Sequence, residues 1–520
     1  MTYIRLVLRA SRALRYGSEQ FKKNFNAAGY THVGPIQRTE IRVDVTGYLA
    51  TRTFSKADQD AFAALSGDRN PMHVDPVSAR RTQAGAPVVH GVHAVLWALD
   101  RLAETSPDRR ANAVNVRFER FLYVGEAIEA VLVSDTADKV TIELRTDGTR
   151  AALITLGFTA TPAVLAPPST TSAAHSVTEP ILRNVQDLDG VSDAFLLVGT
   201  PADAMAAFSA VARVLGPNRV RGFAALSTLV GMECPGLLSI FSKLSVEFDD
   251  SKDGEGETFH YTVRRVQQLL RSAIIDLQAP GLSGFVETFV RQPPIGQPSV
   301  EALRSRVVEG FSRDDRVLVV GGSRGLGELT AKLTALGGGD VTITYARGSQ
   351  EAQAIATEIT AAGGRCRAVA MDIQAPLDAQ LALLGGSFTH CYYFATPPIF
   401  RKRGLLYDRA VLDNFTLFYV DAFSAIAQFL IASEPGMKLF FPSTSAIDER
   451  PKGALEYVIA KQAGEALCDE LARKSPKARI LYQRLPRILT DQTATVLPVR
   501  SADPLELLLP ILADLHQRQN

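Results

Sequence analysis

The sequence predicts two α+β domains of the same kind, followed by a doubly wound α/β domain. Residues 41–160 hold one long apolar helix, over 91–103, among segments that alternate apolar and polar residues as half-buried strands do. Residues 180–293 repeat this arrangement. From residue 315 a buried strand runs into a glycine-rich turn and a helix, which is how parallel sheets with crossover helices begin.

Length and composition restrict the possible functions. A chain of 520 residues is too long for one core, and about three domains are expected. The net charge of +1 gives no electrostatic reason to expect a nucleic-acid partner. We expect no integral membrane segment, because the apolar runs are too short to cross a bilayer. The scattered cysteines predict no metal site and favour a reducing, cytoplasmic location; they are Cys234, Cys366, Cys391 and Cys468.

Residues 1–40 form a basic extension. Arginines interleave with apolar residues from Arg5 to Arg15, and the first acidic residue is Glu19. A transit peptide, a membrane-surface helix or a docking arm would show the same pattern. We favour a basic helix that packs on its own protein, because arginine interrupts the apolar run too often for a secretory signal.

The first domain is predicted over residues 41–160. Ser55 is a typical cap for the helix that follows it. We expect a strand over 42–53, helices over 56–65 and 91–103, and strands over 113–118, 127–134, 140–146 and 151–159. Residues 161–179 are rich in Pro, Ser, Thr and Ala, which predicts a linker.

The second domain is predicted over residues 180–293. Residues 195–209 are similar to residues 48–62, and residues 229–238 are similar to the turn at 88–93. Strands are expected over 243–249, 258–266, 272–277 and 284–291. A second linker over 294–314, with a short polar helix over 300–310, leads to a third domain over 315–520.

The chemistry of the first domain is concentrated in residues 65–79. Gly67 and Pro71 bend this segment, since the residue before a proline is pushed out of the helical region. The bend lets Asp68 and His73 point at one place, where a helix would separate them. Further along, Gly91 begins the long helix, whose first backbone N–H groups favour developing negative charge. This set can add or remove water next to a thioester, with Gly91 N–H holding the enolate-like oxygen.

The segment Gly67-Asp68-x-Asn70-Pro71-x-His73, followed by His90-Gly91, resembles the signature of MaoC-like (R)-specific enoyl-thioester hydratases and dehydratases, which have a hot-dog fold. A lone aspartate and histidine would more often be a turn cap and a half-buried histidine, but this ordered set favours a site. The resemblance implies that Asp68, His73 and Gly91 are catalytic.

The same resemblance implies that the first two domains form a double hot dog, an antiparallel sheet that wraps a long helix in two copies. The second copy departs from the family pattern, because no acid near residues 215–219 is followed five residues later by histidine. We therefore expect it to be catalytically inactive, to complete the pair and to help form the acyl tunnel.

The third domain opens with a cofactor-type turn. The strand that begins at Arg316 ends at Gly321, and Gly321, Gly325 and Gly327 let the backbone approach a pyrophosphate at the start of a helix. A strand over 341–345, a helix over 350–362 and a strand over 367–372 continue the doubly wound pattern.

Much later, Tyr457 and Lys461 lie four residues apart on one helix face. A cation beside a phenol favours the phenolate and lowers the tyrosine pKa, which lets the tyrosine pass a proton near neutral pH. Upstream, a strand over 439–445 ends in hydroxyl groups that could polarise a carbonyl oxygen: Ser443, Thr444 and Ser445.

The glycine turn, the hydroxyl-rich strand end and Tyr-x-x-x-Lys together resemble the short-chain dehydrogenase/reductase family, with its Rossmann fold, over about 315–500. The resemblance implies that Tyr457 protonates a ketone oxygen, and that Lys461 holds the nicotinamide ribose and tunes Tyr457. The family's serine position falls on Thr444, with Ser443 and Ser445 as alternatives. Two further departures are 394–396, in place of the family's Asn-Ala-Gly, and Asp421, in place of its helix asparagine.

NADPH is the expected cofactor. The second strand of this domain ends without an acid that would hold a free ribose, while Arg324 and Arg347 could meet a 2′-phosphate. By the family's pattern Asp372 contacts adenine, and residues 486–490 cover the nicotinamide. The candidate cofactor residues are Gly321, Ser323, Arg324, Gly325, Leu326, Gly327, Arg347, Asp372, Tyr457 and Lys461.

The two signatures describe consecutive steps on an acyl thioester. We expect a 3-oxoacyl group to be reduced with NADPH and then dehydrated to a 2-enoyl group, as in fatty-acid or polyketide biosynthesis. One alternative is hydration followed by oxidation, and another is a reductase with a non-catalytic acyl-binding scaffold. The partner is an acyl-CoA or an acyl-carrier-protein thioester, and the families favour a homodimer.

Overall fold

The structure is a computed structural model that describes residues 47–158, 174–249, 256–399, 407–490, 493 and 499–517. The extension predicted over 1–40 and most of the linker predicted over 161–179 lie outside these residues.

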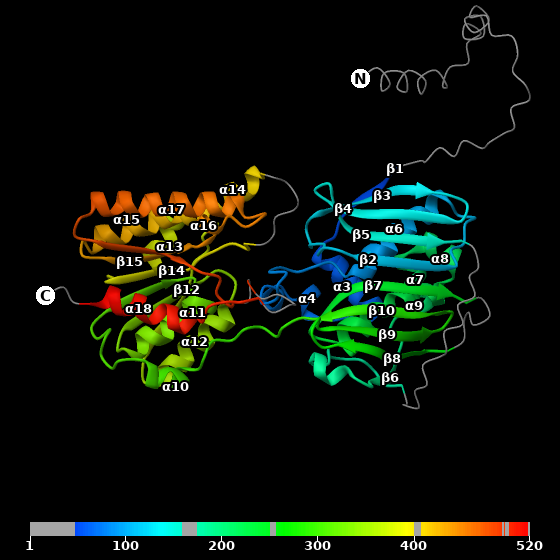
Figure 1. The fold of residues 1–520 in the computed structure, drawn as a ribbon, viewed down its shortest axis with the longest axis horizontal. Coiled ribbons are helices and arrows are strands. Elements are labelled where there is room, and N and C mark those ends of the chain that lie inside the picture. Colours follow the sequence, from blue (N-terminus) through cyan, green and yellow to red (C-terminus); the bar gives the residue numbers. More distant parts are fainter. Residues whose placement is uncertain are drawn as a thin grey trace, which may run out of the picture. The chain divides into compact units, whose positions relative to one another are not determined.

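A ten-stranded antiparallel sheet organises residues 47–290, in the order β1-β3-β4-β5-β2-β7-β10-β9-β8-β6 (Figure 1). The elements of its first half are β1 (Gly47–Thr53), α3 (Lys56–Ser66), α4 (Pro71–Val74), α5 (Pro76–Ala79), α6 (Gly91–Thr105), β2 (Ala113–Phe118), β3 (Ala127–Asp135), β4 (Lys139–Thr146) and β5 (Thr149–Gly157). The predicted helices and strands of the first domain agree with these bounds within a few residues, apart from the start of the first strand, which falls outside the described residues.

The second half repeats the strand order of the first. Its elements are η2 (Val185–Leu188), β6 (Ser192–Leu196), α7 (Pro201–Ala207), α8 (Ser209–Leu215), α9 (Pro217–Thr228), η3 (Leu229–Glu233), β7 (Ser239–Phe248), β8 (Thr258–Gln267), β9 (Ser272–Ala279) and β10 (Leu282–Val290). When the strands of each half are numbered in chain order, the order in the sheet from the outer edge inward is first, third, fourth, fifth, second in both halves. The two second strands, β2 and β7, pair at the centre of the sheet.

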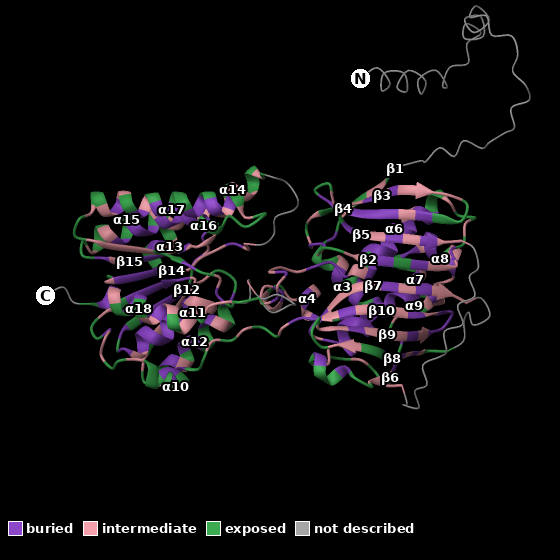
Figure 2. Cartoon of the chain, in the orientation of Figure 1, coloured by how far each residue is buried: buried purple, intermediate pink, exposed green. Residues whose placement is uncertain are grey.

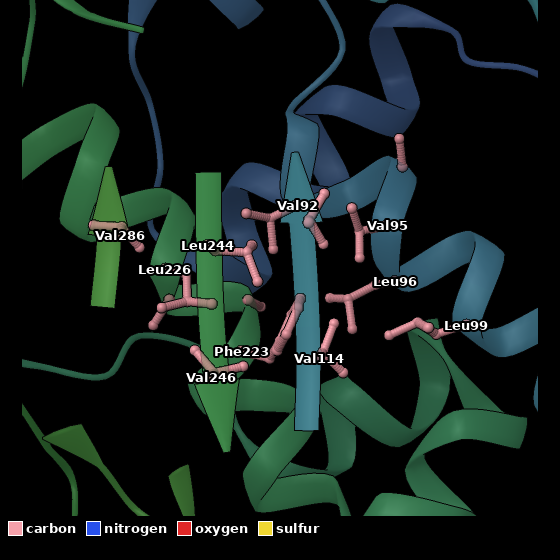
Figure 3. Close-up of a cluster of buried hydrophobic side chains, with 14 of the residues drawn as sticks. Val92, Val95, Leu96, Leu99, Val114, Phe223, Leu226, Leu244, Val246 and Val286 are labelled. Atoms are coloured by element: carbon pink, nitrogen blue, oxygen red, sulfur yellow. The ribbon is translucent and has the colours of Figure 1, made fainter. Parts of the chain in front are cut away.

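The core of this sheet is shared by both halves. The central helix α6 buries eleven of its fifteen residues, which is why its sequence is apolar on nearly every side. Val92, Leu96 and Val114 of the first half belong to the same hydrophobic cluster as Phe223 and Leu244 of the second (Figure 3). Figure 2 shows the buried residues of the helices and strands that enclose this core.

One repeat prediction is wrong. The central helix of the second half is α9, and residues 229–238 follow it as the π-helical turn η3 and the approach to β7. The segment that stands before the central helix, as 88–93 does in the first half, is therefore 215–217. An apolar residue next to glycine occurs at both ends of α9, at Leu215-Gly216 and Val230-Gly231, so the pattern alone could not distinguish its two ends.

The third domain is a six-stranded parallel sheet in the order β13-β12-β11-β14-β15-β16. Its elements are β11 (Arg316–Val320), α11 (Gly325–Leu336), β12 (Asp340–Tyr345), α12 (Ser349–Ala361), β13 (Arg365–Ala370), α13 (Leu377–Leu383), β14 (His390–Tyr393), α14 (Arg409–Thr416), η6 (Leu417–Ala422), α15 (Phe423–Ser433), β15 (Lys438–Thr444), α16 (Ala446–Glu449), α17 (Leu455–Lys474), β16 (Arg479–Leu485) and α18 (Pro504–His516). The helix predicted over 300–310 is shorter: α10 (Val300–Leu303) and the 3₁₀ turn η5 (Arg304–Arg306).

One helical stretch bears on the predicted absence of a membrane segment. Arg409–Ser433, which comprises α14, η6 and α15, is long and apolar enough to cross a membrane by length and composition alone. Its buried residues, including Phe415, Phe423 and Leu430, belong to the hydrophobic core of the parallel sheet. We interpret it as a core helix, although the prediction that no apolar run is long enough was wrong.

Candidate active sites

The first site begins where α3 ends. Gly67 adopts φ +89°, which an L side chain rarely adopts, and an added Cβ would lie 2.7 Å from Val198. This turn carries Asp68 into the interior, where it is 1% exposed. Two residues on, Asn70 caps α4 by accepting a hydrogen bond from Met72 N–H at 3.1 Å. The bend inferred from glycine and proline is therefore present, and it buries the acid.

The Asp68 carboxylate is held by two donors. Its Oδ1 accepts from the Asn70 N–H at 3.0 Å, and its Oδ2 accepts from the Ser227 hydroxyl at 2.6 Å. The Nε2 of His73 lies 4.0 Å from Oδ2. Burial raises the pKa of Asp68, and His73, Ser227 and Asn70 each offset part of that rise. The acid is therefore closer to accepting and releasing a proton near neutral pH than an exposed aspartate is.

His73 is oriented by the backbone. Its Nδ1 lies 2.8 Å from the Val88 carbonyl oxygen, to which it donates its proton. That bond fixes the tautomer and leaves Nε2 as a proton acceptor on the side of Asp68. Asp68 and His73 thus face one place, as the sequence predicted.

His90 packs against His73 and contacts the backbone of Asp68. Its ring stacks on that of His73 at a centroid distance of 3.9 Å, and its Nε2 lies 3.1 Å from the Asp68 carbonyl oxygen. Its Nδ1 lies 2.9 Å from Gln59 Oε1. Burial holds the pKa of His90 well below its usual value, so this imidazole is neutral. The motif included His90, but its role as a packing partner was not foreseen from the sequence.

A cavity of about 80 Å³ lies against Asp68, His73 and Gly91. Gly91 is the first residue of α6, where backbone N–H groups have no partner within the helix. An added Cβ at Gly91 would lie 2.9 Å from the Phe118 ring, so the close approach of that ring requires glycine. The predicted acid, base and helix start therefore meet at one cavity.

The second half of the sheet supplies part of this site. Besides Ser227, the cavity is lined by Val230, Gly231 and Phe241. Gly231 accepts a hydrogen bond from the Asn70 side-chain amide at 2.8 Å, and an added Cβ there would lie 2.6 Å from the Asp68 oxygens. The sequence did not indicate these residues, because they carry no motif and lie some 160 residues away in the chain.

Replacing Ser227 with alanine is expected to raise the pKa of Asp68 further, because it removes a donor to the carboxylate. One hydrogen bond to a charged group contributes about 1.5 kcal/mol, so the Asp68-dependent limb of the pH–rate profile moves up by about one pH unit. The profile of thioester hydration measures this. Ser245→Ala, which removes a partly exposed hydroxyl bonded to Asn115, is the control. An unshifted profile in Ser227→Ala would contradict the assignment.

A second buried acid lies where the two halves meet. Asp100 of α6, which is 4% exposed, accepts hydrogen bonds from the Ala210 and Val211 N–H groups of α8 at 2.8 and 3.0 Å. This carboxylate caps a helix start. That the second copy is inactive stays a prediction.

The second candidate site begins at the glycine turn after β11. An added Cβ at Gly321 (φ +81°) would lie 2.8 Å from the Ala395 nitrogen, and one at Gly327 would lie 2.3 Å from the Gly321 oxygen. Gly325 (φ +58°) instead has no atom within 4 Å of its Cβ position. Two glycines therefore permit close packing and the third leaves open space at the start of α11, which fits a dinucleotide pyrophosphate.

The other predicted cofactor residues surround this turn. Ser323 is 6% exposed, Arg324 is the N-cap of α11, and Leu326 is half-buried within it. Arg347 is exposed after β12, and Asp372 lies two residues after β13 ends. Residues 486–490 follow β16.

The structure separates the hydroxyl groups at the end of β15. Thr444 lies close enough to the Tyr457 phenol to lower its pKa, whereas Ser443 is 4% exposed and donates to Glu465 Oε1 at 2.5 Å. Of the two, Thr444 is therefore the one that faces the phenol. Burial raises the pKa of Tyr457, and Thr444 offsets part of this. The prediction of a lowered tyrosine pKa is wrong in this structure, because burial raises it.

Lys461 is 5% exposed, and its Nζ donates to the Pro442 carbonyl oxygen at 2.6 Å. Burial lowers the pKa of Lys461 to about 7. The residue of the preceding helix that reaches it is Tyr419, whose ring centroid lies 3.8 Å from Nζ. Asp421, which stands in place of the family's helix asparagine, is exposed in the π-helical turn η6, whereas Tyr419 is buried there.

Two groups of side chains in the described residues have donor atoms close enough for a metal ion: Asp68, His73 and His90, and Asp315, His390 and His516. In the first group, both nitrogens of His90 already have protein partners. In the second, the His390 and His516 rings stack at 4.0 Å and 6°, so their lone pairs do not converge on one point. We derive no metal chemistry from either group.

Comparison with known proteins decides the family. Residues 37–151 match the family model described as MaoC like domain, and residues 315–384 match the one described as short chain dehydrogenase. An (R)-specific enoyl-CoA hydratase of Aeromonas caviae is 32% identical over 114 residues, which are 21% of this chain and 78% of that protein. This chain belongs to the MaoC-like family.

Further relatives match each domain. The mitochondrial 3-hydroxyacyl-[acyl-carrier-protein] dehydratase of Arabidopsis thaliana is 29% identical over 100 residues, 18% of this chain and 60% of that protein. An uncharacterized oxidoreductase of Mycobacterium tuberculosis is 45% identical over 78 residues, 15% of this chain and 29% of that protein. Among solved structures, a short-chain dehydrogenase/reductase from Serratia marcescens has 21% identity and a TM-score of 0.36, covering 40% of this chain and 91% of that one. The match of residues 315–384 shows that the MaoC-like chain carries a short-chain dehydrogenase domain as well.

Proposed function

We propose that this protein is a bifunctional enzyme that reduces a 3-oxoacyl thioester to the 3-hydroxyacyl thioester with NADPH and then removes water to give the trans-2-enoyl thioester. The observation that carries the proposal is the Asp68 carboxylate, buried against Ser227 and the Asn70 N–H and facing His73 Nε2 at the cavity under Gly91. The proposal is supported by the match of residues 37–151 to the MaoC like domain, which includes Asp68 and His73, and by the match of residues 315–384 to the short chain dehydrogenase model.

In the dehydration, Asp68 and His73 share the proton transfers. His73 Nε2 takes the α-proton, since its Nδ1–H is committed to Val88 O. The acid form of Asp68, which burial favours, protonates the departing hydroxyl group. Gly91 N–H holds the thioester oxygen while it carries negative charge. Water leaves, and the C2–C3 double bond forms.

In the reduction, Tyr457 gives its hydroxyl proton to the ketone oxygen. Thr444, whose side chain lowers the pKa of that phenol, orients it in this proposal. The nicotinamide, when bound, supplies the hydride to the ketone carbon. Lys461 lies four residues away on α17 and stabilises the phenolate that remains.

The same proposal assigns the domains. Residues 41–160 are the active hot dog and residues 180–293 the inactive copy, so together they form a double hot dog; residues 315–520 are the reductase. The repeated strand order supports the pairing. The extension over 1–40 and the linkers over 161–179 and 294–314 complete the assignment. A cytoplasmic location and a homodimer are parts of this proposal.

We propose NADPH and not NADH as the cofactor, because the positive charges of Arg324 and Arg347 could meet a 2′-phosphate. Arg347→Ala is expected to raise the KM for NADPH about 10- to 100-fold while the KM for NADH changes little, because a charged hydrogen bond to a 2′-phosphate contributes about 1.5–3 kcal/mol. Steady-state kinetics with both cofactors measures this. Arg365→Ala, at the start of β13, is the control. Equal effects on both cofactors would contradict the assignment.

The opposite direction is the second candidate. The Aeromonas relative is named a hydratase and the Arabidopsis relative a dehydratase, so each direction has support. Hydration followed by oxidation would be expected to use NAD. We place the enzyme in fatty-acid or polyketide biosynthesis because its proposed cofactor is NADPH.

The test is to incubate the protein with 3-oxoacyl-CoA or 3-oxoacyl-carrier-protein and either NADPH or NADH, and to identify products by mass. We expect the 2-enoyl thioester with NADPH. Formation of 3-hydroxyacyl product alone would support a reductase on a non-catalytic scaffold. Turnover of 2-enoyl thioester with NAD, with no reduction by NADPH, would support the oxidative direction. The thioester that reacts faster, acyl-CoA or acyl-carrier-protein, identifies the partner of the enzyme.

A further inference from the structure

The Lys461 ammonium is enclosed by aromatic rings. Its Nζ lies 3.8 Å from the centroid of Tyr419, 4.6 Å from that of Phe441 and 6.0 Å from that of Tyr457. The Pro442 carbonyl oxygen, at 2.6 Å, is its hydrogen-bond acceptor. At 5% exposure the side chain has little water to replace these contacts.

Tyr419 is itself rigidly held. It is 1% exposed, and its hydroxyl lies 2.5 Å from Thr396 Oγ1. Phe415 stacks on its ring at 5.8 Å, and Tyr457 meets it edge-on at 5.9 Å. Tyr419 therefore touches both members of the Tyr-x-x-x-Lys pair.

The local backbone explains why this tyrosine reaches the site. Tyr419 lies in η6, a π-helical turn inserted between α14 and α15. An insertion of this kind changes the direction of side chains relative to a regular helix, and such turns are frequent at functional sites. In this turn Tyr419 is buried while Asp421 is exposed.

We propose that Tyr419 is a positioning residue of the reductase site, which holds the Lys461 ammonium against the Pro442 carbonyl and beside Tyr457 through the face of its ring. The proposal rests on the ketone reduction proposed above. A cation is attracted to the face of an aromatic ring, more strongly where water is excluded. A lysine side chain has many rotamers, so this contact selects one position of the charge.

Two other ionisable side chains act on Lys461, those of Glu465 and Cys468. Glu465, one turn further on α17, is bound to Arg484 at 2.7 Å and to Ser443 at 2.5 Å, so its carboxylate is already paired. Cys468 is buried, and burial raises the pKa of its thiol to about 12, which keeps it neutral. The ring of Tyr419, at 3.8 Å, therefore supplements the Pro442 carbonyl in stabilising the ammonium.

The test compares Tyr419→Phe, Tyr419→Leu and the control Phe423→Leu. Phe423 is a buried ring of the same helical stretch that contacts Tyr393 and, like Tyr419, Phe441, but of the two rings it is that of Tyr419 that lies over the Lys461 Nζ. The first readout is the Lys461 pKa in the cofactor-free protein, from the pH dependence of its Cε signal in carbon-13 NMR. We expect it to fall by about one unit in Tyr419→Leu, where the ring attraction is lost, and to stay unchanged in the other two.

The second readout is the pH profile of kcat for NADPH-dependent ketone reduction. We expect kcat to fall about 10- to 100-fold in Tyr419→Leu with a shifted profile, and to stay within about threefold in Tyr419→Phe with an unshifted profile. An unchanged or raised Lys461 pKa in Tyr419→Leu, or equal shifts in Phe423→Leu, would overturn the proposal. If wild-type protein reduces no 3-oxoacyl thioester, the proposed function fails instead, and the NMR measurement still decides whether Tyr419 holds the lysine.

Discussion

Replacing Asp68 with asparagine is expected to slow the interconversion of 2-enoyl and 3-hydroxyacyl thioesters by about 10²–10⁴-fold, the usual contribution of a positioned general acid or base. Asparagine keeps the shape and can still contact Ser227, but it has no proton to exchange at this pH. The ultraviolet absorbance of the conjugated enoyl thioester follows the reaction. Reduction of a 3-oxoacyl thioester by the same variant is expected to be unchanged.

The matched control is Asp60→Asn, on α3, whose exposed carboxylate pairs with Lys56 at 2.7 Å. We expect wild-type rates from it, since it lies on the opposite side of the helix from the buried residues. Wild-type hydration in Asp68→Asn would refute a catalytic role for this carboxylate and would favour the scaffold alternative.

Replacing Tyr457 with phenylalanine is expected to reduce NADPH consumption with a 3-oxoacyl thioester by about 10²–10⁴-fold, because the ring stays in place while the proton donor is lost. The edge-on contacts with Phe415 and Tyr419 need only the ring, so the fold should persist. Hydration of an enoyl thioester should continue at the wild-type rate.

Tyr482→Phe, on β16, controls for the loss of a hydroxyl group elsewhere in the same sheet. Undiminished NADPH consumption in Tyr457→Phe would show that another group protonates the ketone. A loss of both activities at once would indicate damage to the whole protein, and thermal melting of each variant separates that outcome from a catalytic one.

The sequence predicted the strands and the long helix of residues 47–158 well, because each of them carries a strong local pattern. The alternation in β3, β4 and β5 and the all-round apolar helix α6 give nearly unambiguous periodicities. The Gly67–Pro71 bend and the glycine turn before α11 were also predictable, since the backbone there requires these residue types.

The parts of the sites that depend on distant contacts were not predictable from the sequence. Ser227 reaches Asp68 from 159 positions away, and no spacing rule connects a serine in one half of a sheet to an acid in the other. Tyr419 enters its site through a π-helical turn, which shifts side-chain direction without a sequence signature. Alternation along β15 places Ser443 and Thr444 on opposite faces, which favours Thr444 over Ser443, and which of Ser443, Thr444 and Ser445 acts stays a prediction.

The most direct measurement supplies 3-oxoacyl thioester and NADPH deuterated at the transferred hydride position, and examines the product by mass spectrometry. The account predicts a 2-enoyl thioester with one deuterium at C3, and the deuterated 3-hydroxyacyl thioester as the end product of Asp68→Asn. An enoyl product without deuterium, or 3-oxoacyl thioester left unchanged by wild-type protein, would contradict the claim that both sites act in turn on one substrate.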